Sequence, residues 1–195
     1  TANRMRSIYK IKQPISIIYN GLEIHDNFEQ PNTEGNYKQL KSIHNPIIFS
    51  GTLTQKKGIY ELVKAVVAIL ETGINTTLIV NGKDTINHST GLLVKQGLLQ
   101  IIPEAFQKNI IFNGHITRDE LLDQYKLSKV AVFPSFAEAF AMAPMEAMLV
   151  GVPTIYSDTC SGSELIADKI NGLLINPKSI ESIVSSIKYM INNPD

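Results

Sequence analysis

The sequence predicts an α/β protein, a Rossmann-like, doubly wound parallel sheet of about six strands with helices on both faces. Two observations predict this fold. Short apolar segments alternate with amphipathic helical segments over most of the 195 residues. The apolar segments are hydrophobic at consecutive positions, which is typical of strands that a parallel sheet buries on both faces.

The first half of this alternation begins at residues 46–51, where Pro-Ile-Ile-Phe-Ser-Gly predicts a buried strand. Residues 58–72 predict a helix, because aliphatic side chains recur there every three or four positions. Residues 77–80 and 109–114 predict the second and third strands. The stretch between them, 83–108, is less regular, and its leucines favour a helix packed on the sheet.

The second half begins with a capping box at 117–120 (Thr-Arg-Asp-Glu), which predicts a helix that ends near Ser128. Further strands are expected at 130–134, 154–157 and 173–175, and further helices at 142–150, 163–169 and 179–192. Pro144 is tolerated in the first turn of its helix, and Gly151 stops that helix. Parallel sheets bind ligands at the carboxyl ends of their strands, so we expect the loops that follow the strands to form the site.

The N-terminal part differs from the rest of the chain. We interpret residues 1–45 as an N-terminal segment with a linker strand from a missing N-terminal domain, and residues 46–195 as the sheet domain. Residues 15–21 (Ile-Ser-Ile-Ile-Tyr-Asn-Gly) predict that strand and a turn, whereas the polar residues 26–45 predict a mobile loop. The chain starts at Thr1 inside a helix-like stretch, so we expect it to be a piece of a longer protein.

The composition narrows the class of protein and of partner. Lys+Arg and Asp+Glu number 18 each, so the net charge is zero and no basic stripe predicts a nucleic-acid partner. Cys160 is the only cysteine, which excludes an internal disulfide and fits a reducing compartment. No apolar run is long enough to cross a bilayer, and we expect no signal peptide. We therefore expect a cytoplasmic location, with peripheral attachment to the inner membrane face left open.

Two acids flank the start of the helix expected at 142–150. Glu138 lies in the loop before that helix and Glu146 lies inside it. A carboxylate is a bidentate acceptor suited to a vicinal diol, and a helix N-terminus binds phosphate through its free N–H groups. Lys57, at the end of another strand-to-helix loop, is suited to a diphosphate. The sequence thus predicts a ligand with hydroxyls and phosphates; the alternative is that all three are ordinary surface residues.

Further residues around these three resemble a known family. Pro134-Ser135, Glu138, Phe140, Glu146-Ala147-Met148, Gly151-Val152-Pro153 and Asn171-Gly172 resemble the C-terminal half of family 4 retaining glycosyltransferases with the GT-B fold. The phosphate-side loop of that family is similar to 50–53 with 56–59, and its nucleotide-side segment to 113–125. Residues 18–21 resemble the segment that leads into this half, and the resemblance covers about 15–192.

The resemblance implies a function and a set of site residues. The domain would bind a nucleotide-diphosphate sugar, UDP- or GDP-linked, and transfer the sugar to a glycan or lipid acceptor with retention of configuration. Glu138 and Lys57 would be catalytic, and no cofactor or metal is implied. The donor-binding residues would be Gly51, Thr52, Lys57, Ile116, Glu138, Phe140, Ala141, Met142 and Glu146. Glu146 would hold the ribose hydroxyls, and without its acceptor domain this chain is expected to be inactive.

Two departures from the family keep other interpretations open. The family usually has an arginine five positions before the lysine, where this chain has Thr52, and Lys56 is the candidate substitute. The family generally has glycine at the positions of Ala139 and Ala141, so the donor pocket would be tighter here. A non-catalytic nucleotide-sugar-binding module is the main alternative. A GT-B epimerase is a minor alternative. A nicotinamide dehydrogenase is disfavoured, because this chain lacks a G-x-G-x-x-G turn after its first strand.

Overall fold

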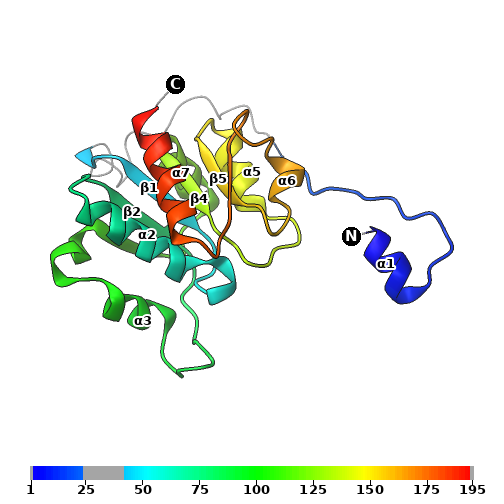
Figure 1. Ribbon diagram of the computed structural model, residues 1–195, viewed down its shortest axis with the longest axis horizontal. Coiled ribbons are helices and arrows are strands. Elements are labelled where there is room, and N and C mark those ends of the chain that lie inside the picture. The colour runs from blue at the N-terminus through cyan, green and yellow to red at the C-terminus, as the bar shows by residue number, and fades with distance from the viewer. Residues whose placement is uncertain (1, 24–41, 194–195) are drawn as a thin grey trace.

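The computed structural model describes residues 2–23 and 42–193, and Figure 1 shows their arrangement. Six parallel strands form one sheet in the order β3-β2-β1-β4-β5-β6. The strands are β1 (Pro46–Ser50), β2 (Thr77–Asn81), β3 (Ile110–Gly114), β4 (Val130–Phe133), β5 (Thr154–Ser157) and β6 (Leu173–Ile175). The predicted Rossmann-like, doubly wound sheet is therefore confirmed, and each strand lies within about a residue of its predicted position.

Helices cover both faces of the sheet, whereas α1 (Ala2–Tyr9) lies apart from it (Figure 1). The other helices are α2 (Ile59–Glu71), α3 (Val94–Ile101), α4 (Arg118–Lys126), α5 (Met142–Leu149), α6 (Gly162–Leu165) and α7 (Ile180–Asn192), with 3-10 turns η2 (Gln55–Lys57) and η3 (Glu104–Asn109). Helices α2, α3 and α7 pack on one hydrophobic core, and α2 and α7 lie side by side on that face (Figure 1). Helices α4 and α5 pack on a second core on the other face.

The strands are hydrophobic at consecutive positions because each face of the sheet has its own core. Ile47 belongs to the core under α2 and α7, whereas the next residue, Ile48, belongs to the core under α4 and α5. Leu78 and Ile79 divide between the two cores in the same way. Successive side chains of a strand point to opposite faces, so a strand buried on both sides has no polar alternation.

Two element predictions are wrong. The linker strand expected at 15–21 is absent from the described residues: the chain there forms no regular secondary structure and pairs with no strand, and Ile18 is 91% exposed. A strand needs a hydrogen-bonded neighbour, and no described segment supplies one. The helix expected at 163–169 is only Gly162–Leu165, because the buried Ile166 takes an extended backbone (φ −109°, ψ 121°). Most of the loop predicted at 26–45 lies outside the described residues.

Candidate functional site

The loop after β1 lies between the loops after β2 and β4, and two glycines allow the close approach. A Cβ atom on Gly82 would lie 1.9 Å from the carbonyl oxygen of Gly51. A Cβ atom on Gly58 would lie 2.0 Å from the carbonyl oxygen of Pro134, and Gly58 has a φ of +71°. The Phe136 N–H also donates to the Lys56 carbonyl at 2.8 Å. These contacts fix the three loops against one another at the carboxyl edge of the sheet.

A pocket of about 460 Å³ opens at this edge, at the carboxyl ends of β1, β2 and β3. Its lining combines cationic side chains, one carboxylate, small or polar residues and two aliphatic side chains. They are Ser50, Gly51, Thr52, Asn81, Gly82, Lys83, His115, Ile116, Thr117, Arg118, Leu121 and Glu146. Such a mixture can bind phosphate oxygens and hydroxyl groups in the same space.

The buried end of this pocket is stiffened by three amide side chains. The Asn81 side chain donates to the Gln124 oxygen at 2.8 Å, and the Asn113 side chain donates to the Asn81 oxygen at 2.9 Å. Asn81 and Gln124 are almost fully buried, so these hydrogen bonds satisfy groups that water cannot reach. The network ties the ends of β2 and β3 to α4.

Glu146 forms an ion pair across the pocket wall. Its Oε1 lies 3.0 Å from Nε of Arg118, with the Glu146 side chain 12% exposed and the Arg118 side chain 38% exposed. The capping box places Arg118 as the first residue of α4: the Thr117 N–H donates to the Glu120 carboxylate at 2.8 Å, and the Glu120 N–H donates to Thr117 Oγ1 at 3.3 Å. A partly buried carboxylate thus has a more exposed cation as its partner.

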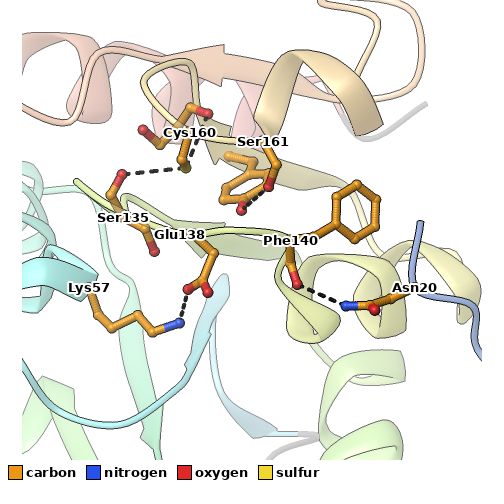
Figure 2. Close-up of polar contacts among 9 residues, drawn as sticks. Asn20, Lys57, Ser135, Glu138, Phe140, Cys160 and Ser161 are labelled. Atoms are coloured by element: carbon orange, nitrogen blue, oxygen red, sulfur yellow. Dashed lines mark hydrogen bonds and ion pairs between the residues drawn. The ribbon is translucent and has the colours of Figure 1, made fainter. Parts of the chain in front are cut away.

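Lys57 and Glu138 form a second ion pair beside the pocket (Figure 2). Lys57 comes from the loop after β1 and Glu138 from the loop after β4, and their side chains are 21% and 20% exposed. A Cβ atom on Gly51 would lie 3.9 Å from Cδ and Cε of Lys57. Because Gly51 lines the pocket, the Lys57 stem lies next to a residue of the pocket wall, whereas Lys57 and Glu138 themselves are not among the lining residues.

The segment between Glu138 and α5 carries the other predicted donor-binding residues. Ala141 has an extended backbone (φ −79°, ψ 135°) and is the N-cap of α5, and Met142 is its first residue. The first N–H groups of a helix have no partner within the helix. Phe140 contacts the N-terminal segment: its carbonyl accepts from Nδ2 of Asn20 at 3.3 Å, and its ring lies 5.1 Å from the Tyr19 ring.

Two tyrosines beneath the site stay neutral. Burial raises the pKa of the Tyr125 hydroxyl above its ordinary value. Burial also raises the pKa of Tyr156, with smaller increases from Cys160 and from the charge of Glu138, and the Tyr156 hydroxyl lies 3.0 Å from Oγ of Ser161. The charge of the site therefore comes from its lysines, arginine and glutamates.

The structure brings the predicted residues together in two adjacent groups. Gly51, Thr52, Ile116 and Glu146 line the pocket, whereas Lys57 and Glu138 form the ion pair that borders it. Phe140, Ala141 and Met142 form the approach to α5. Within residues 2–23 and 42–193, no cluster of three or more His, Cys, Asp or Glu side chains could hold a metal ion.

Sequence reasoning missed two cations of the site. Arg118 had been interpreted only as part of a capping box, and its partner Glu146 is 28 positions away, so no local pattern connects them. Lys83 lines the same pocket as Thr52 and follows β2 directly. A lysine at a strand end was the signal that could have identified it. Lys56, the expected substitute for the missing arginine, is exposed and is not among the residues that line this pocket.

The sheet order and the pocket at its carboxyl edge define a Rossmann-like domain of the kind that forms one half of a GT-B enzyme. The chain belongs to the family described as glycosyl transferases group 1, whose model matches residues 36–195. The predicted likeness to a GT-B glycosyltransferase is thereby confirmed at the level of family and fold.

Three known proteins illustrate the likeness. An uncharacterized glycosyltransferase of Methanocaldococcus jannaschii is 27% identical over 194 residues, which cover 92% of this chain and 48% of the relative. The C-terminal domain of LpcC, a group 1 glycosyl transferase from Francisella tularensis, has a TM-score of 0.69 at 28% identity and covers 80% of both chains. A mutant of Staphylococcus aureus TarM, in complex with fondaparinux, α-GlcNAc-glycerol and UDP, has a TM-score of 0.76 at 17% identity, covering 99% of this chain and 36% of TarM. The chain thus spans less than half the length of the first of these relatives.

Proposed function

We propose that this domain binds the nucleotide-diphosphate sugar, UDP- or GDP-linked, of a retaining hexosyltransferase that transfers the sugar to a glycan or lipid acceptor. The observation that carries the proposal is the adjacency of the pocket and the Lys57–Glu138 pair on one edge of the sheet. The UDP in the TarM complex supports a nucleotide ligand for this fold. The acceptor would be bound together with a further domain, as the coverage of the relatives suggests.

In this proposal the nucleoside occupies the 460 Å³ pocket. The backbone at Ile116 would meet the base, and Glu146 would accept hydrogen bonds from the ribose hydroxyls. Glu146 is suited to this role because a carboxylate can accept from both hydroxyls of a vicinal diol. Its ion pair with Arg118 orients it at the wall of the pocket.

The diphosphate would lie between the pocket and the ion pair, against Lys57 and Lys83. Cleavage of the bond between the sugar and the diphosphate leaves negative charge on the departing phosphate, and each fixed donor that meets this charge is worth roughly 3–4 kcal/mol. Thr52 offers a hydroxyl but no charge. Lys83 lines the same pocket and would supply the cation that Thr52 lacks, whereas Glu138 would lie at the sugar.

Calorimetric titration of the chain with UDP and with GDP tests the proposal. We expect heat with one of them and a tenfold or greater loss of affinity in Glu146→Gln, because hydrogen bonds to a charged group contribute about 1.5–3 kcal/mol, roughly 10- to 150-fold in Kd. Glu181→Gln, an exposed change on α7, is the matched control and should bind like the wild type. No heat and no shift in Tm with either nucleotide would contradict the proposal.

The alternative, a non-catalytic nucleotide-sugar-binding module, is not favoured. The observation that favoured it is the absence of the family's arginine at position 52, but Lys83 provides a cation in the same pocket. Turnover of a radiolabelled donor by the whole protein, abolished in Glu138→Gln, would exclude this alternative. No helix in the described ranges is long and apolar enough to cross a bilayer. The cytoplasmic location, the peripheral attachment and the absence of a nucleic-acid partner stay predictions.

A further inference from the structure

We propose that Tyr19 and Asn20 are positioning residues: they hold the loop 138–141 and thereby set the affinity for the sugar part of the donor. The inference rests on the proposed function, because it assumes that the sugar lies at Glu138 and at the backbone of residues 140–142. It adds a role for the N-terminal segment, which neither the pocket nor the ion pair includes.

Both contacts are directed at Phe140, a single residue of the loop, and Figure 2 shows the one made by Asn20. The Asn20 side chain donates to the Phe140 carbonyl at 3.3 Å, across 120 positions of sequence. The Tyr19 ring packs on the Phe140 ring with centroids 5.1 Å apart and an angle of 41° between the planes. Two adjacent residues thus hold both the backbone and the side chain of Phe140.

Glu164 of α6 also acts on Tyr19. A side-chain hydrogen bond with Glu164, followed by the charge of that carboxylate, raises the pKa of the Tyr19 hydroxyl above its ordinary value. The proposed role of the segment depends on the two contacts with Phe140.

Burial does not explain why the segment lies here. Ile18 is 91% exposed, and Ile17 and Tyr19 are each 53% exposed. Because little apolar surface of Ile17, Ile18 and Tyr19 is removed from water, the contacts of Tyr19 and Asn20 with Phe140 help to place the segment against the loop.

The loop itself has few other anchors. The Phe136 N–H bond to Lys56 fixes its beginning, and α5 starts at Met142. Between these two points, the polar side-chain contacts in the described structure are the Lys57–Glu138 pair and the Asn20 bond to Phe140. Loss of the Asn20 bond would remove the polar contact that holds the backbone of Phe140 from the N-terminal side, so the N–H groups of residues 140–142 would be less well positioned.

Comparison of the affinities for the nucleotide and for the nucleotide sugar distinguishes a change in the position of the loop from a general loss of structure. Kd is measured for UDP, UDP-glucose, GDP and GDP-mannose with the wild type, Asn20→Ala and Tyr19→Ala. We expect each variant to bind the bare nucleotide within about twofold of the wild type and the nucleotide sugar about 3- to 10-fold more weakly, the range of one lost hydrogen bond or ring contact. Tyr19→Phe keeps the ring contact and should lie between the wild type and Tyr19→Ala.

The chain offers matched controls at the end of α7. The exposed Asn193 side chain donates to the Tyr189 carbonyl at 2.8 Å, and the Tyr189 side chain is 57% exposed. Asn193→Ala and Tyr189→Ala therefore remove an equivalent amide bond and an equivalent exposed ring far from the loop in sequence. Both should bind nucleotide and nucleotide sugar like the wild type.

A readout without ligand separates this inference from the proposed function. Amide hydrogen exchange of the peptide that covers 138–142 should be faster in Asn20→Ala and Tyr19→Ala, and unchanged in the two controls. If the wild type binds neither nucleotide, the proposed function fails, and the exchange rates alone decide whether the segment holds the loop. Unchanged exchange in both variants, or an equal loss of affinity for nucleotide and nucleotide sugar, would overturn the inference.

Discussion

The Lys57–Glu138 pair allows a direct test of the geometry of the site, independent of any ligand. The perturbation is a double-mutant cycle of Lys57→Gln, Glu138→Gln and the double variant. Both substitutions keep a long polar side chain and remove one charge, so the cycle isolates the interaction between the charges. We expect each single variant to be less stable than the wild type and the double variant to be less destabilised than the sum.

The exposure of the two side chains determines how large a coupling free energy we expect from the cycle. Two unit charges about 4 Å apart attract by roughly 4 kcal/mol at an effective dielectric constant near 20. Desolvation and lost side-chain freedom offset much of this, and exposed pairs retain only about 0.2–1 kcal/mol. With both side chains about one fifth exposed, this pair lies between an exposed and a fully buried one. We therefore expect a coupling free energy of about 1–2 kcal/mol.

Urea unfolding, followed by circular dichroism, measures the four free energies of unfolding. Lys56→Gln is the control, because Lys56 is the exposed neighbour and only its backbone carbonyl contacts the loop after β4. It should change the stability by less than about 0.5 kcal/mol. A coupling free energy below about 0.3 kcal/mol, the usual error of additivity, would show that the pair does not form in solution and would refute the reasoning.

Three further changes test the surroundings of the site by urea unfolding. Gly58→Ala should destabilise the chain by more than about 2 kcal/mol, because the left-handed backbone and the Pro134 carbonyl both exclude a Cβ atom; a smaller loss would mean that the two loops separate easily. Gln124→Ala should cost about 2–3 kcal/mol, since it leaves the buried Asn81 amide without its acceptor, and a cost near zero would argue against the amide network. Arg118→Gln should cost less than about 1 kcal/mol because the guanidinium is partly exposed; a larger loss would give the pair with Glu146 a structural role.

The fold could be predicted from the sequence because its signals are local. Runs such as Ile47-Ile48-Phe49 are hydrophobic at consecutive positions, and the helix periods and capping box between the runs are equally short-range. The strand predicted at 15–21 is wrong because a strand needs a neighbouring strand to pair with. The apolar residues of the segment do not show whether such a neighbour exists. The helix at 163–169 failed because the buried Ile166 takes an extended backbone, a tertiary effect on a helical pattern.

The site could be predicted only in part, for the same physical reason. The rule that ligands bind at the carboxyl ends of parallel strands identified the loops, and Thr52, Ile116 and Glu146 line one pocket there. Ion pairs between residues of different loops could not be predicted. The strand order that brings Lys57 to Glu138, and α4 to α5, cannot be read from any local sequence pattern. Whether these residues bind a donor stays a prediction.

The two ion pairs suggest how one site could bind both an anionic diphosphate and the hydroxyls of a sugar. Each acid expected to hold hydroxyls has a cation as its partner: Glu138 pairs with Lys57 and Glu146 with Arg118. In the proposed complex the diphosphate would attract Lys57 while Glu138 turns to the sugar hydroxyls, so charged partners are exchanged rather than left unpaired in a partly buried site. Such an exchange costs less than exposing a bare charge to an apolar wall. Lys83 lies in the same pocket as Thr52, so in the proposed complex it would add a cation near the diphosphate where the residue at position 52 brings none.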